Sequence, residues 1–469
     1  MNRAKRLYIL LGVLVVVCAA AALVLRMEQR QEQIETSGET VLEIDPDTVQ
    51  TLSWTYEDQT LSFHRDESWI YDGDEAFPVD GDKIAQLLEQ FEAFNAAFTI
   101  SEVENYGQYG LEDPQCTISL TAGEQSYEIL LGSYSTMDSQ RYVSFGDGNV
   151  YLAVNDPLDA YGVELKDLIL DDQIPGLDQV TSLTFSGVEN YEIFYQEDSG
   201  YTYSDQDLYF TRQNEGTLPL DTDLVEGYLD NIRYLVPGDY VTYNVTDQEL
   251  QTYGLDDPEL TVTADYTYED EDGNQASDTF TLHISRDPEE RSAAQEEGQE
   301  TEEDEEEEIT AYLRVGDSQI VYQLSGEDYT ALMAASYDQL RHKQVLWADP
   351  GSITQLDISL EGESYTLTFQ EEDGEQVGYY LEEKADTAAL QDALEALEAE
   401  EFTSQSPSDQ LEIQLTVYLD NENFPQVQIQ LYRQDGTHCL AVVDGQSVSL
   451  VPRSQVVDLT EAVRELVWQ

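Results

Sequence analysis

A hexapeptide that occurs twice constrains the fold of this chain more than any other sequence feature. Residues 109–114 read Tyr-Gly-Leu-Glu-Asp-Pro and residues 253–258 read Tyr-Gly-Leu-Asp-Asp-Pro, so five of the six positions are identical. Each copy leads directly into a strand-like run, at 115–120 and at 259–264. Because the segments that flank the two copies also correspond, the sequence predicts a tandem repeat.

The hexapeptide has the composition of a turn that precedes a strand. Its glycine can adopt a tight or left-handed conformation, and its proline directs the preceding residue towards extended geometry. We expect the tyrosine and leucine to pack inward while the two acids stay hydrated; a ligand loop built on the acids is the alternative. The residues of this structural repeat signature are Tyr109, Gly110, Leu111 and Pro114, and again Tyr253, Gly254, Leu255 and Pro258.

An unbroken apolar run, Leu7 to Leu25, follows the basic residues Arg3, Lys5 and Arg6. At about 1.5 Å per residue, a helix of this length nearly spans the ~30 Å hydrocarbon core of a bilayer. The positive flank predicts a cytoplasmic N-terminus (1–6), a transmembrane anchor (7–25), a polar juxtamembrane linker (26–40) and an extracytoplasmic remainder.

A cleaved signal peptide is the alternative to an anchor, since residues 19–22 are all alanine. The apolar run continues beyond these alanines, which favours an uncleaved segment. Val17 precedes Cys18 where lipoprotein processing needs a small residue, so a lipid anchor is rejected.

The rest of the chain is divided into three predicted repeat units, at 41–175, 176–347 and 351–469. The first two have the same order of strands, helix, hexapeptide, strands and closing helix. The second also carries an acidic insert (287–309) that we expect to be disordered, because like charges repel. The third is a shorter, degenerate unit without the hexapeptide, either a cap or a diverged module. These patterns predict an α+β fold of strand-dominated tandem repeats, in which each curved antiparallel sheet carries one or two helices.

The composition is strongly acidic, with 98 acidic against 20 basic side chains and a formal net charge of −78 over 469 residues. Such a surface repels phosphate backbones, which excludes nucleic acid as a partner. It could attract cations or basic proteins, although a soluble, strongly hydrated surface is the favoured interpretation. The hydrophobic content of 41% is sufficient for packed cores.

The sequence offers no catalytic, cofactor-binding or metal-binding constellation. The three cysteines and four histidines are scattered without metal-ligand spacing, and we expect Cys116 and Cys439 to be buried thiols. Acid pairs such as Asp72 with Asp74 or Asp80 with Asp82 could serve a hydrolase, but pairs are expected by chance in so acidic a chain. The acidic run at 302–308 does not have the spacing of a calcium loop.

The Tyr-Gly-Leu-x-x-Pro turns, the helix before each and the strand-rich stretch after each resemble the bacterial domain of unknown function 4340 (DUF4340) family. The closing segments Leu165–Leu170 and Leu340–Leu346 also resemble that family. The resemblance implies a membrane-anchored extracytoplasmic protein with an accessory role beside an ABC-type export permease and gliding-type auxiliary subunits. It carries no catalytic residues.

We therefore expect a non-enzymatic accessory or scaffold protein that needs no cofactor and no small-molecule substrate. Its partners would be the membrane, through Leu7 to Leu25, and ABC-type permease subunits. The alternative is a cell-envelope surface module that binds a polymer, peptide or cation. Tyrosines that could form its contact surface are Tyr201, Tyr203, Tyr209, Tyr266 and Tyr268.

Overall fold

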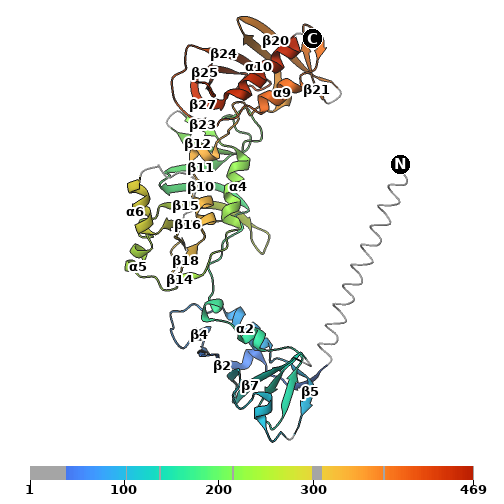
Figure 1. Cartoon of the computed structure of the whole chain (residues 1–469), viewed down its shortest axis with the longest axis vertical. Helices are drawn as coiled ribbons and strands as arrows, with labels where there is room; N and C mark the ends of the chain where they lie inside the picture. Colours follow the sequence, from blue (N-terminus) through green and yellow to red (C-terminus); the bar gives the residue numbers. More distant parts are fainter. Residues whose placement is uncertain are drawn as a thin grey trace, which may run out of the picture. The chain divides into compact units, whose positions relative to one another are not determined.

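The computed structural model describes residues 38–469 except residues 102, 137–138, 214–215, 298–308, 373–374 and 468–469. The described chain is strand-dominated and forms three antiparallel sheets of nine strands each, accompanied by a few helices (Figure 1). Contacts divide the chain into two compact units. Unit 1 contains the residues up to Asp172 together with Thr242–Asn244, and unit 2 contains Gln173–Val241 and Val245–Gln469.

The first sheet lies in unit 1 and has the strand order β1-β5-β9-β8-β7-β6-β2-β3-β4. Its strands are β1 Glu39–Leu42, β2 Val49–Tyr56, β3 Gln59–Arg65, β4 Trp69–Tyr71, β5 Phe94–Ile100, β6 Cys116–Ala122, β7 Gln125–Ser135, β8 Gln140–Ser144 and β9 Val150–Ala153. The helices of this part are η1 Pro46–Thr48, α2 Gly81–Glu89, η2 Tyr106–Tyr109, α3 Leu158–Tyr161 and η3 Leu165–Leu168.

The second sheet has the order β13-β12-β11-β10-β15-β16-β17-β18-β14. Its strands are β10 Gln179–Gly187, β11 Tyr191–Tyr195, β12 Tyr209–Gln213, β13 Gly216–Pro219, β14 Tyr240–Thr242, β15 Leu260–Glu269, β16 Gln275–Arg286, β17 Ala311–Val315 and β18 Val321–Leu324. The helices are α4 Thr222–Arg233, α5 Asp247–Thr252, α6 Pro288–Glu297, α7 Gly326–Met333 and α8 Tyr337–Leu340.

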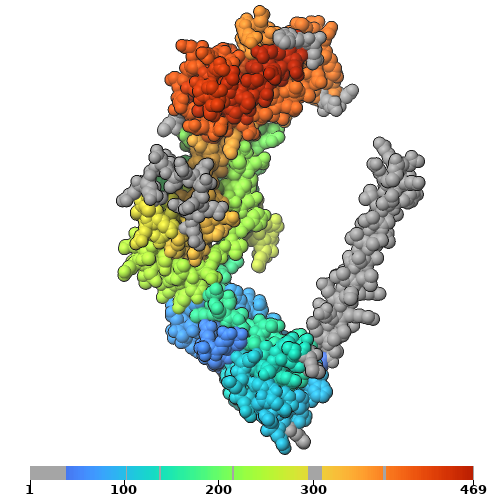
Figure 2. All heavy atoms as spheres, in the orientation of Figure 1, coloured from blue at the N-terminus to red at the C-terminus, as the bar shows by residue number. Residues whose placement is uncertain are grey.

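The third sheet has the order β22-β21-β20-β19-β24-β25-β26-β27-β23, so the repeat without the hexapeptide forms as many strands as the others. Its strands are β19 Ile353–Leu360, β20 Glu363–Glu372, β21 Glu375–Tyr380, β22 Glu383–Ala385, β23 Glu401–Phe402, β24 Leu411–Leu419, β25 Gln426–Arg433, β26 His438–Val443 and β27 Gln446–Pro452. The helices are η4 Pro350–Ser352, α9 Ala388–Glu395 and α10 Arg453–Val467, and the space-filling view shows this repeat in orange to red (Figure 2).

A β-bulge occurs at the same place in all three sheets, which ties the third repeat to the other two. Each central pair joins the first long strand to the strand that follows the turn region: β2 with β6, β10 with β15, and β19 with β24. The register shifts by one residue near the start of the first partner, after Val49, after Val180 and after Ile353. A bulge that recurs at the same place in each sheet is a feature of the fold rather than a local irregularity.

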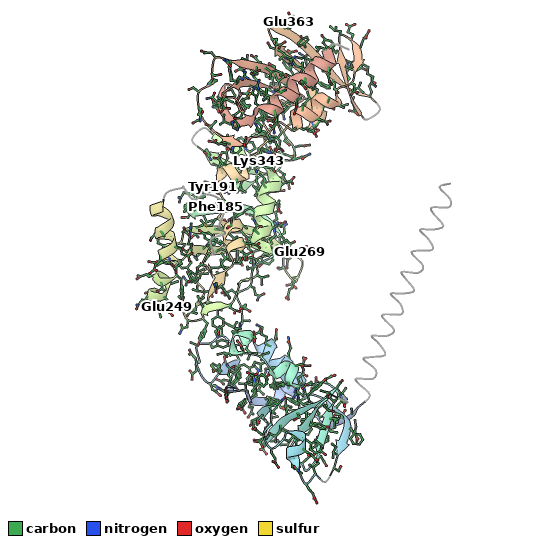
Figure 3. All side chains as sticks on the ribbon, viewed as in Figure 1. Phe185, Tyr191, Glu249, Glu269, Lys343 and Glu363 are labelled. Carbon is green, nitrogen blue, oxygen red and sulfur yellow. The ribbon has the colours of Figure 1, made fainter. Side chains whose placement is uncertain are left out.

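Alternating side chains place one face of each sheet in a core and leave the other face more exposed. In β2, Leu52 and Trp54 are buried while Thr51 and Thr55 are exposed. The Trp54 ring stacks on Phe63 and meets the edge of Tyr161. Burying a side chain of this size contributes about 1.5–3 kcal/mol. In the second sheet the buried Phe185 lies beside Tyr191, whereas Glu269 of the same sheet and Glu363 of the third sheet are exposed (Figure 3).

Helices α2 and α4 each begin at an aspartate N-cap. The Asp80 carboxylate accepts hydrogen bonds from two backbone N–H groups at the start of α2, and Asp221 does the same for α4. Both helices bury an apolar stripe with helical spacing. A buried tyrosine then fixes each to the next helix: Tyr161 in α3 donates to the Leu87 carbonyl, and Tyr228 in α4 donates to the Leu332 carbonyl, both at 2.9 Å.

Part of the acidic insert differs from its prediction as a disordered loop, because Pro288–Glu297 forms α6. Asp287 accepts a hydrogen bond from the Glu289 N–H, and the Arg291 guanidinium donates to the Asp257 carbonyl at 3.0 Å. These contacts hold the first turn of the helix despite its acidic composition. The remaining acidic residues 298–308 lie outside the described residues, as does the apolar run Leu7 to Leu25. Among the described residues, no helix has the length and apolar character needed to cross a bilayer.

Candidate functional site

The irregular segment 196–208, between β11 and β12, buries more polar groups than a surface loop normally does. Thr202, Ser204 and Asp207 are all at least nine-tenths buried, and Tyr203 between them is 9% exposed. Burying a carboxylate is costly unless hydrogen bonds satisfy it. Long ordered loops with this character are common places for binding sites.

Asp207 is the centre of a hydrogen-bond cluster that joins the segment 196–208 to the end of the second repeat. Its Oδ2 atom accepts from the Thr202 hydroxyl at 2.5 Å and from the Trp347 indole N–H at 3.2 Å. Its Oδ1 atom is 2.9 Å from Nε2 of His342. The two partners from the end of the second repeat lie 135 and 140 residues away in sequence, so only the folded chain brings them together.

An aromatic stack supports the same cluster. The His342 and Trp347 rings are nearly parallel with centroids 4.5 Å apart, and the Tyr203 ring stacks on Trp347 at 4.7 Å. Phe424, from the loop that follows β24, meets the Tyr203 ring edge-on. Tyr203 belongs to the second repeat but packs in the hydrophobic core of the third, so this loop fixes the third sheet to the second.

His342 also reaches the N-terminus of α4, where its Nδ1 atom is 3.6 Å from Oδ2 of the capping residue Asp221. The imidazole therefore lies between two carboxylates and is only 11% exposed. A hollow of about 370 Å³ opens on this side and includes Asp207, Asp221 and His342 in its lining.

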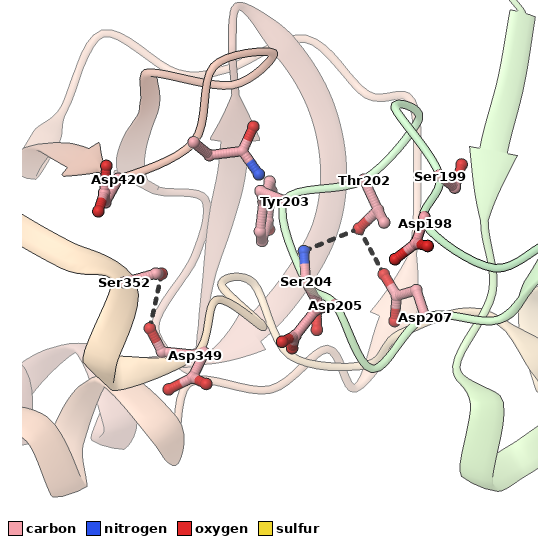
Figure 4. A pocket seen from close by; sticks show the side chains of 11 residues that line it. Asp198, Ser199, Thr202, Tyr203, Ser204, Asp205, Asp207, Asp349, Ser352 and Asp420 are labelled. Carbon is pink, nitrogen blue, oxygen red and sulfur yellow. Dashed lines mark hydrogen bonds between the residues drawn. The ribbon is translucent and has the colours of Figure 1, made fainter.

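A second cavity, of about 220 Å³, shares Ser204 and Asp207 with this hollow and is rich in acidic groups (Figure 4). Figure 4 shows Tyr203 near its middle, with Asp349 and Asp420 on one side and Thr202 and Asp207 on the other. Hydroxyl and amide groups complete the polar lining. The carboxylates that line the cavity are Asp198, Asp205, Asp207, Asp349 and Asp420.

The carboxylates of the cavity differ in the number of hydrogen bonds that they accept. Both oxygens of Asp207 are used within the cluster, and Asp349 accepts a hydrogen bond from the Gly351 N–H at the start of η4. Over the described part of the chain, no hydrogen bond or ion pair engages the side chains of Asp198, Asp205 and Asp420. Three unneutralised carboxylates at one hollow create a negative potential that favours a positively charged group.

The hydrogen bonds of the cluster do not form the arrangement of an activated hydroxyl nucleophile. Thr202 and His342 both contact the Asp207 carboxylate, so the hydroxyl is not hydrogen-bonded to the imidazole as an activated nucleophile requires. In the described ranges, no group of three or more His, Cys, Asp or Glu side chains has the arrangement of a metal site. What remains is an acid-lined hollow with a rigid aromatic wall.

The repeat-signature residues lie outside this cavity and form structural turns. Gly110 and Gly254 adopt left-handed conformations with φ of 71° and 68°, and Leu111 and Leu255 are buried. Tyr109 and Tyr253 make similar ring contacts, at 4.9 Å with Tyr142 and at 4.8 Å with Tyr312. Pro114 and Pro258 precede the strands β6 and β15 by two residues.

The other sequence candidates separate in space or serve local structure. Asp80 is the cap of α2, Asp72 contacts His64, and Asp74 accepts from Tyr243 and from the Ala76 N–H. Among the five tyrosines considered for a contact surface, Tyr203, Tyr209 and Tyr266 are buried, while Tyr201 and Tyr268 are partly exposed. Cys116 and Cys439 are buried free thiols, which confirms their prediction.

The cluster around Asp207 was not found from the sequence. Asp207 is one of 98 acidic residues, and His342 is one of four scattered histidines. The one sequence signal is the Tyr-Thr-Tyr-Ser run at 201–204. That signal selects the segment but not its partners at the end of the same repeat.

No curated protein and no solved structure is significantly similar to this chain. A family model described as a domain of unknown function (DUF4340) matches two adjacent segments, residues 69–204 and 211–416. The interval between the segments, residues 205–210, covers the end of the loop that carries Asp207 and the start of β12. Two adjacent matches that cover most of the chain agree with a tandem arrangement, and this chain belongs to the DUF4340 family.

Proposed function

We propose that this protein is a membrane-anchored extracytoplasmic accessory or scaffold protein that acts by binding and is associated with an ABC-type export complex. The observation that carries the proposal is the combination of an apolar N-terminal run after basic residues with three successive sheet repeats. Each sheet is open and so presents two edge strands and one broad face, which suits protein contacts.

The construction of the repeats supports a mechanical role. The polar groups of the described cluster, Asp207 with Thr202, His342 and Trp347, hold the loop whose Tyr203 packs in the core of the third repeat. A rigid joint of this kind is useful in a scaffold that holds partners at fixed positions. The association with an export permease rests on the family resemblance and is the part of the proposal that most needs an experiment.

A module that binds a ligand in the cell envelope is the second candidate. The acid-lined cavity of about 220 Å³ favours it, because three of its carboxylates have no partner in the described chain. This candidate needs the same anchor but a different partner.

Crosslinking in intact cells, followed by purification through a C-terminal tag and mass spectrometry, tests the proposal. We expect an ABC-type permease and its ATPase to be enriched. A variant in which Leu7 to Leu25 is replaced by an unrelated apolar segment of equal length is the matched control, since it keeps anchoring and changes the helix surface. Recovery of the permease with both proteins places the interface on the extracytoplasmic repeats. Recovery of wall polymer or soluble proteins alone contradicts the transporter association and favours the second candidate.

A further inference from the structure

The outward face of the first sheet carries hydroxyl groups along its central pair of strands, β2 and β6. All six outward side chains of this pair are serine or threonine, although 25% of the chain is charged. They alternate with buried residues, and they are Thr51, Ser53 and Thr55 in β2 and Thr117, Ser119 and Thr121 in β6. Strand β3 adds Thr60 and Ser62 on the same side of the sheet.

The strand register places these hydroxyls next to one another. Ser53 lies directly opposite Ser119 of β6 and Ser62 of β3. Thr55 lies directly opposite Thr60, and their hydroxyl oxygens are 2.9 Å apart. Directly opposed residues have Cβ atoms about 4.5–5.5 Å apart, and alternate residues along a strand are about 6.6–6.8 Å apart. The hydroxyls therefore form a regular grid.

The fold does not require hydroxyls at these positions. The corresponding pair of the second sheet, β10 with β15, carries Asp265, and the pair of the third sheet, β19 with β24, carries Asp357. Each of these carboxylates accepts a hydrogen bond from a threonine on a neighbouring strand. Since the other two sheets accommodate a charge in the same pair, the uncharged face of the first sheet is not a consequence of sheet formation.

A hollow of about 330 Å³ lies on this face. Its lining includes Thr51, Ser53 and Ser119, together with Glu128 of β7. Within the part of the chain that the structure describes, these four side chains make no hydrogen bond or ion pair. The volume is within the range of small-molecule sites, ~300–1,000 Å³. A second hollow, of about 580 Å³, shares Thr51 and is also lined by His64 of β3, so the available surface extends beyond one pocket.

These groups select a neutral, hydroxylated ligand. Glu128 and the net charge of −78 repel anions, and a cation meets only this one carboxylate in the lining. Protein interfaces depend on aromatic and arginine anchors, whereas serine and threonine are under-represented among the residues that carry their affinity. A sugar hydroxyl both donates and accepts, as serine and threonine hydroxyls do, and Glu128 adds a charged acceptor that strengthens a hydrogen bond.

We propose that the outward face of the first sheet, centred on Ser53 and Ser119, binds a neutral polysaccharide. The sugar chain crosses β7, β6 and β2, where Glu128 accepts from one of its hydroxyls and the two serines exchange hydrogen bonds with others. A polymer uses this face better than a single sugar, because Thr51 belongs to both hollows. The inference does not depend on the transporter association, since it rests on this face alone.

Affinity electrophoresis of the purified full-length chain, in native gels with a non-ionic detergent, tests the site. Separate gels contain dextran, pullulan, hydroxyethyl cellulose or galactomannan, all of which are neutral. We expect at least one of them to retard the chain relative to an unrelated acidic protein. The retardation should persist at high salt, because an uncharged ligand is not bound through screened charges. The anionic polygalacturonate should cause no retardation.

Variants make the assignment specific. Ser53→Ala/Ser119→Ala removes two hydroxyls without changing the charge and should weaken binding about fivefold or more. Ser68→Ala/Ser101→Ala makes the same chemical change at exposed serines outside both hollows and should leave the retardation unchanged. Neither variant should change the urea concentration at which Cys116 is half alkylated, because Ser53 and Ser119 have no hydrogen bond to lose.

Glu128→Gln keeps an acceptor oxygen but removes its charge, and it should weaken binding about threefold. Equal retardation of the wild-type chain and the Ser53→Ala/Ser119→Ala variant overturns the proposal. The absence of retardation by all four neutral polysaccharides overturns it, and so does retardation that disappears at high salt.

Discussion

His438 and His283 show how neighbouring groups move the pKa of the same side chain in opposite directions. His438 lies 2.9 Å from the Glu400 carboxylate and 3.5 Å from Asp435, and the hydrogen bond to Glu400 raises its pKa above 6.5. His283 lies in β16 opposite Arg314 of β17; burial, and secondarily this cation, lowers its pKa.

Titration of the imidazole protons by NMR should therefore give a midpoint above 6.5 for His438 and below 6.5 for His283. Glu400→Gln should lower the His438 midpoint and leave that of His283 unchanged. Because a raised histidine pKa stabilises the fold below the unfolded pKa, the contribution of His438 is present at acidic pH and is lost as pH rises through its folded pKa. Coincident midpoints for the two histidines would contradict this electrostatic assignment.

Single residues were predictable where their role is local. Gly110 is required by a left-handed turn, and the burial of Cys116 follows from its place in an alternating strand. Asp207 is different because its importance depends on His342 and Trp347, which approach it only after the end of the second repeat has folded back onto the segment 196–208. No local property of the Asp207 sequence distinguishes it from an ordinary solvated acid.

At the scale of elements, the turn of the hexapeptide combines backbone strain with close packing. Gly110 has φ of 71°, and a Cβ atom there would lie 2.2 Å from Oγ and 2.8 Å from the backbone N of Ser133 in β7. Gly123, in the β6–β7 turn, has a similar φ of 58°, but a Cβ atom at this position would meet no other atom within 4 Å. A side chain at Gly123 would therefore strain only the backbone, whereas a side chain at Gly110 would also clash with β7.

Gly123→Ala should lower the free energy of unfolding of unit 1 by about 1–2 kcal/mol, the cost of a left-handed alanine. Gly110→Ala should cost about 1–3 kcal/mol more, because β7 must also move. Urea unfolding of the full-length variants, followed by alkylation of Cys116, measures both values in the same unit. Equal losses for the two variants would show that the hexapeptide packs loosely against β7.

Elements whose formation depends on their own pattern were predicted from sequence, and those that depend on distant contacts were not. The helix after Asp80 has its cap and its apolar stripe within one short segment, so its position was evident. Helix α6 has no comparable stripe; its Arg291 is held by the Asp257 carbonyl and lies 3.7 Å from the buried Glu259 carboxylate. Composition alone therefore favoured disorder where tertiary contacts favour a helix.

At the scale of the whole molecule, each compact unit has, among its described residues, one buried thiol that can report its unfolding. Cys116 belongs to unit 1 and Cys439 to unit 2. Burial raises the pKa of Cys116 to about 12 and that of Cys439 to about 11, so little reactive thiolate is present near neutral pH. Alkylation at increasing urea concentrations, followed by mass spectrometry of the peptides, gives one unfolding midpoint for each unit.

Asp207→Ala tests whether the cluster makes the second and third repeats one cooperative unit. The change leaves the Thr202 hydroxyl, the Trp347 indole N–H and His342 without their common acceptor, which should cost about 3 kcal/mol. Tyr203 of the same loop packs in the core of the third repeat, which also contains Cys439. The loss of stability should therefore lower the urea concentration at which Cys439 is half alkylated. The corresponding urea concentration for Cys116 should stay constant. Asp272→Ala removes one charge from an exposed turn and should leave both midpoints unchanged. An unchanged Cys439 midpoint in Asp207→Ala would mean that the cluster orders its own loop without joining the two sheets.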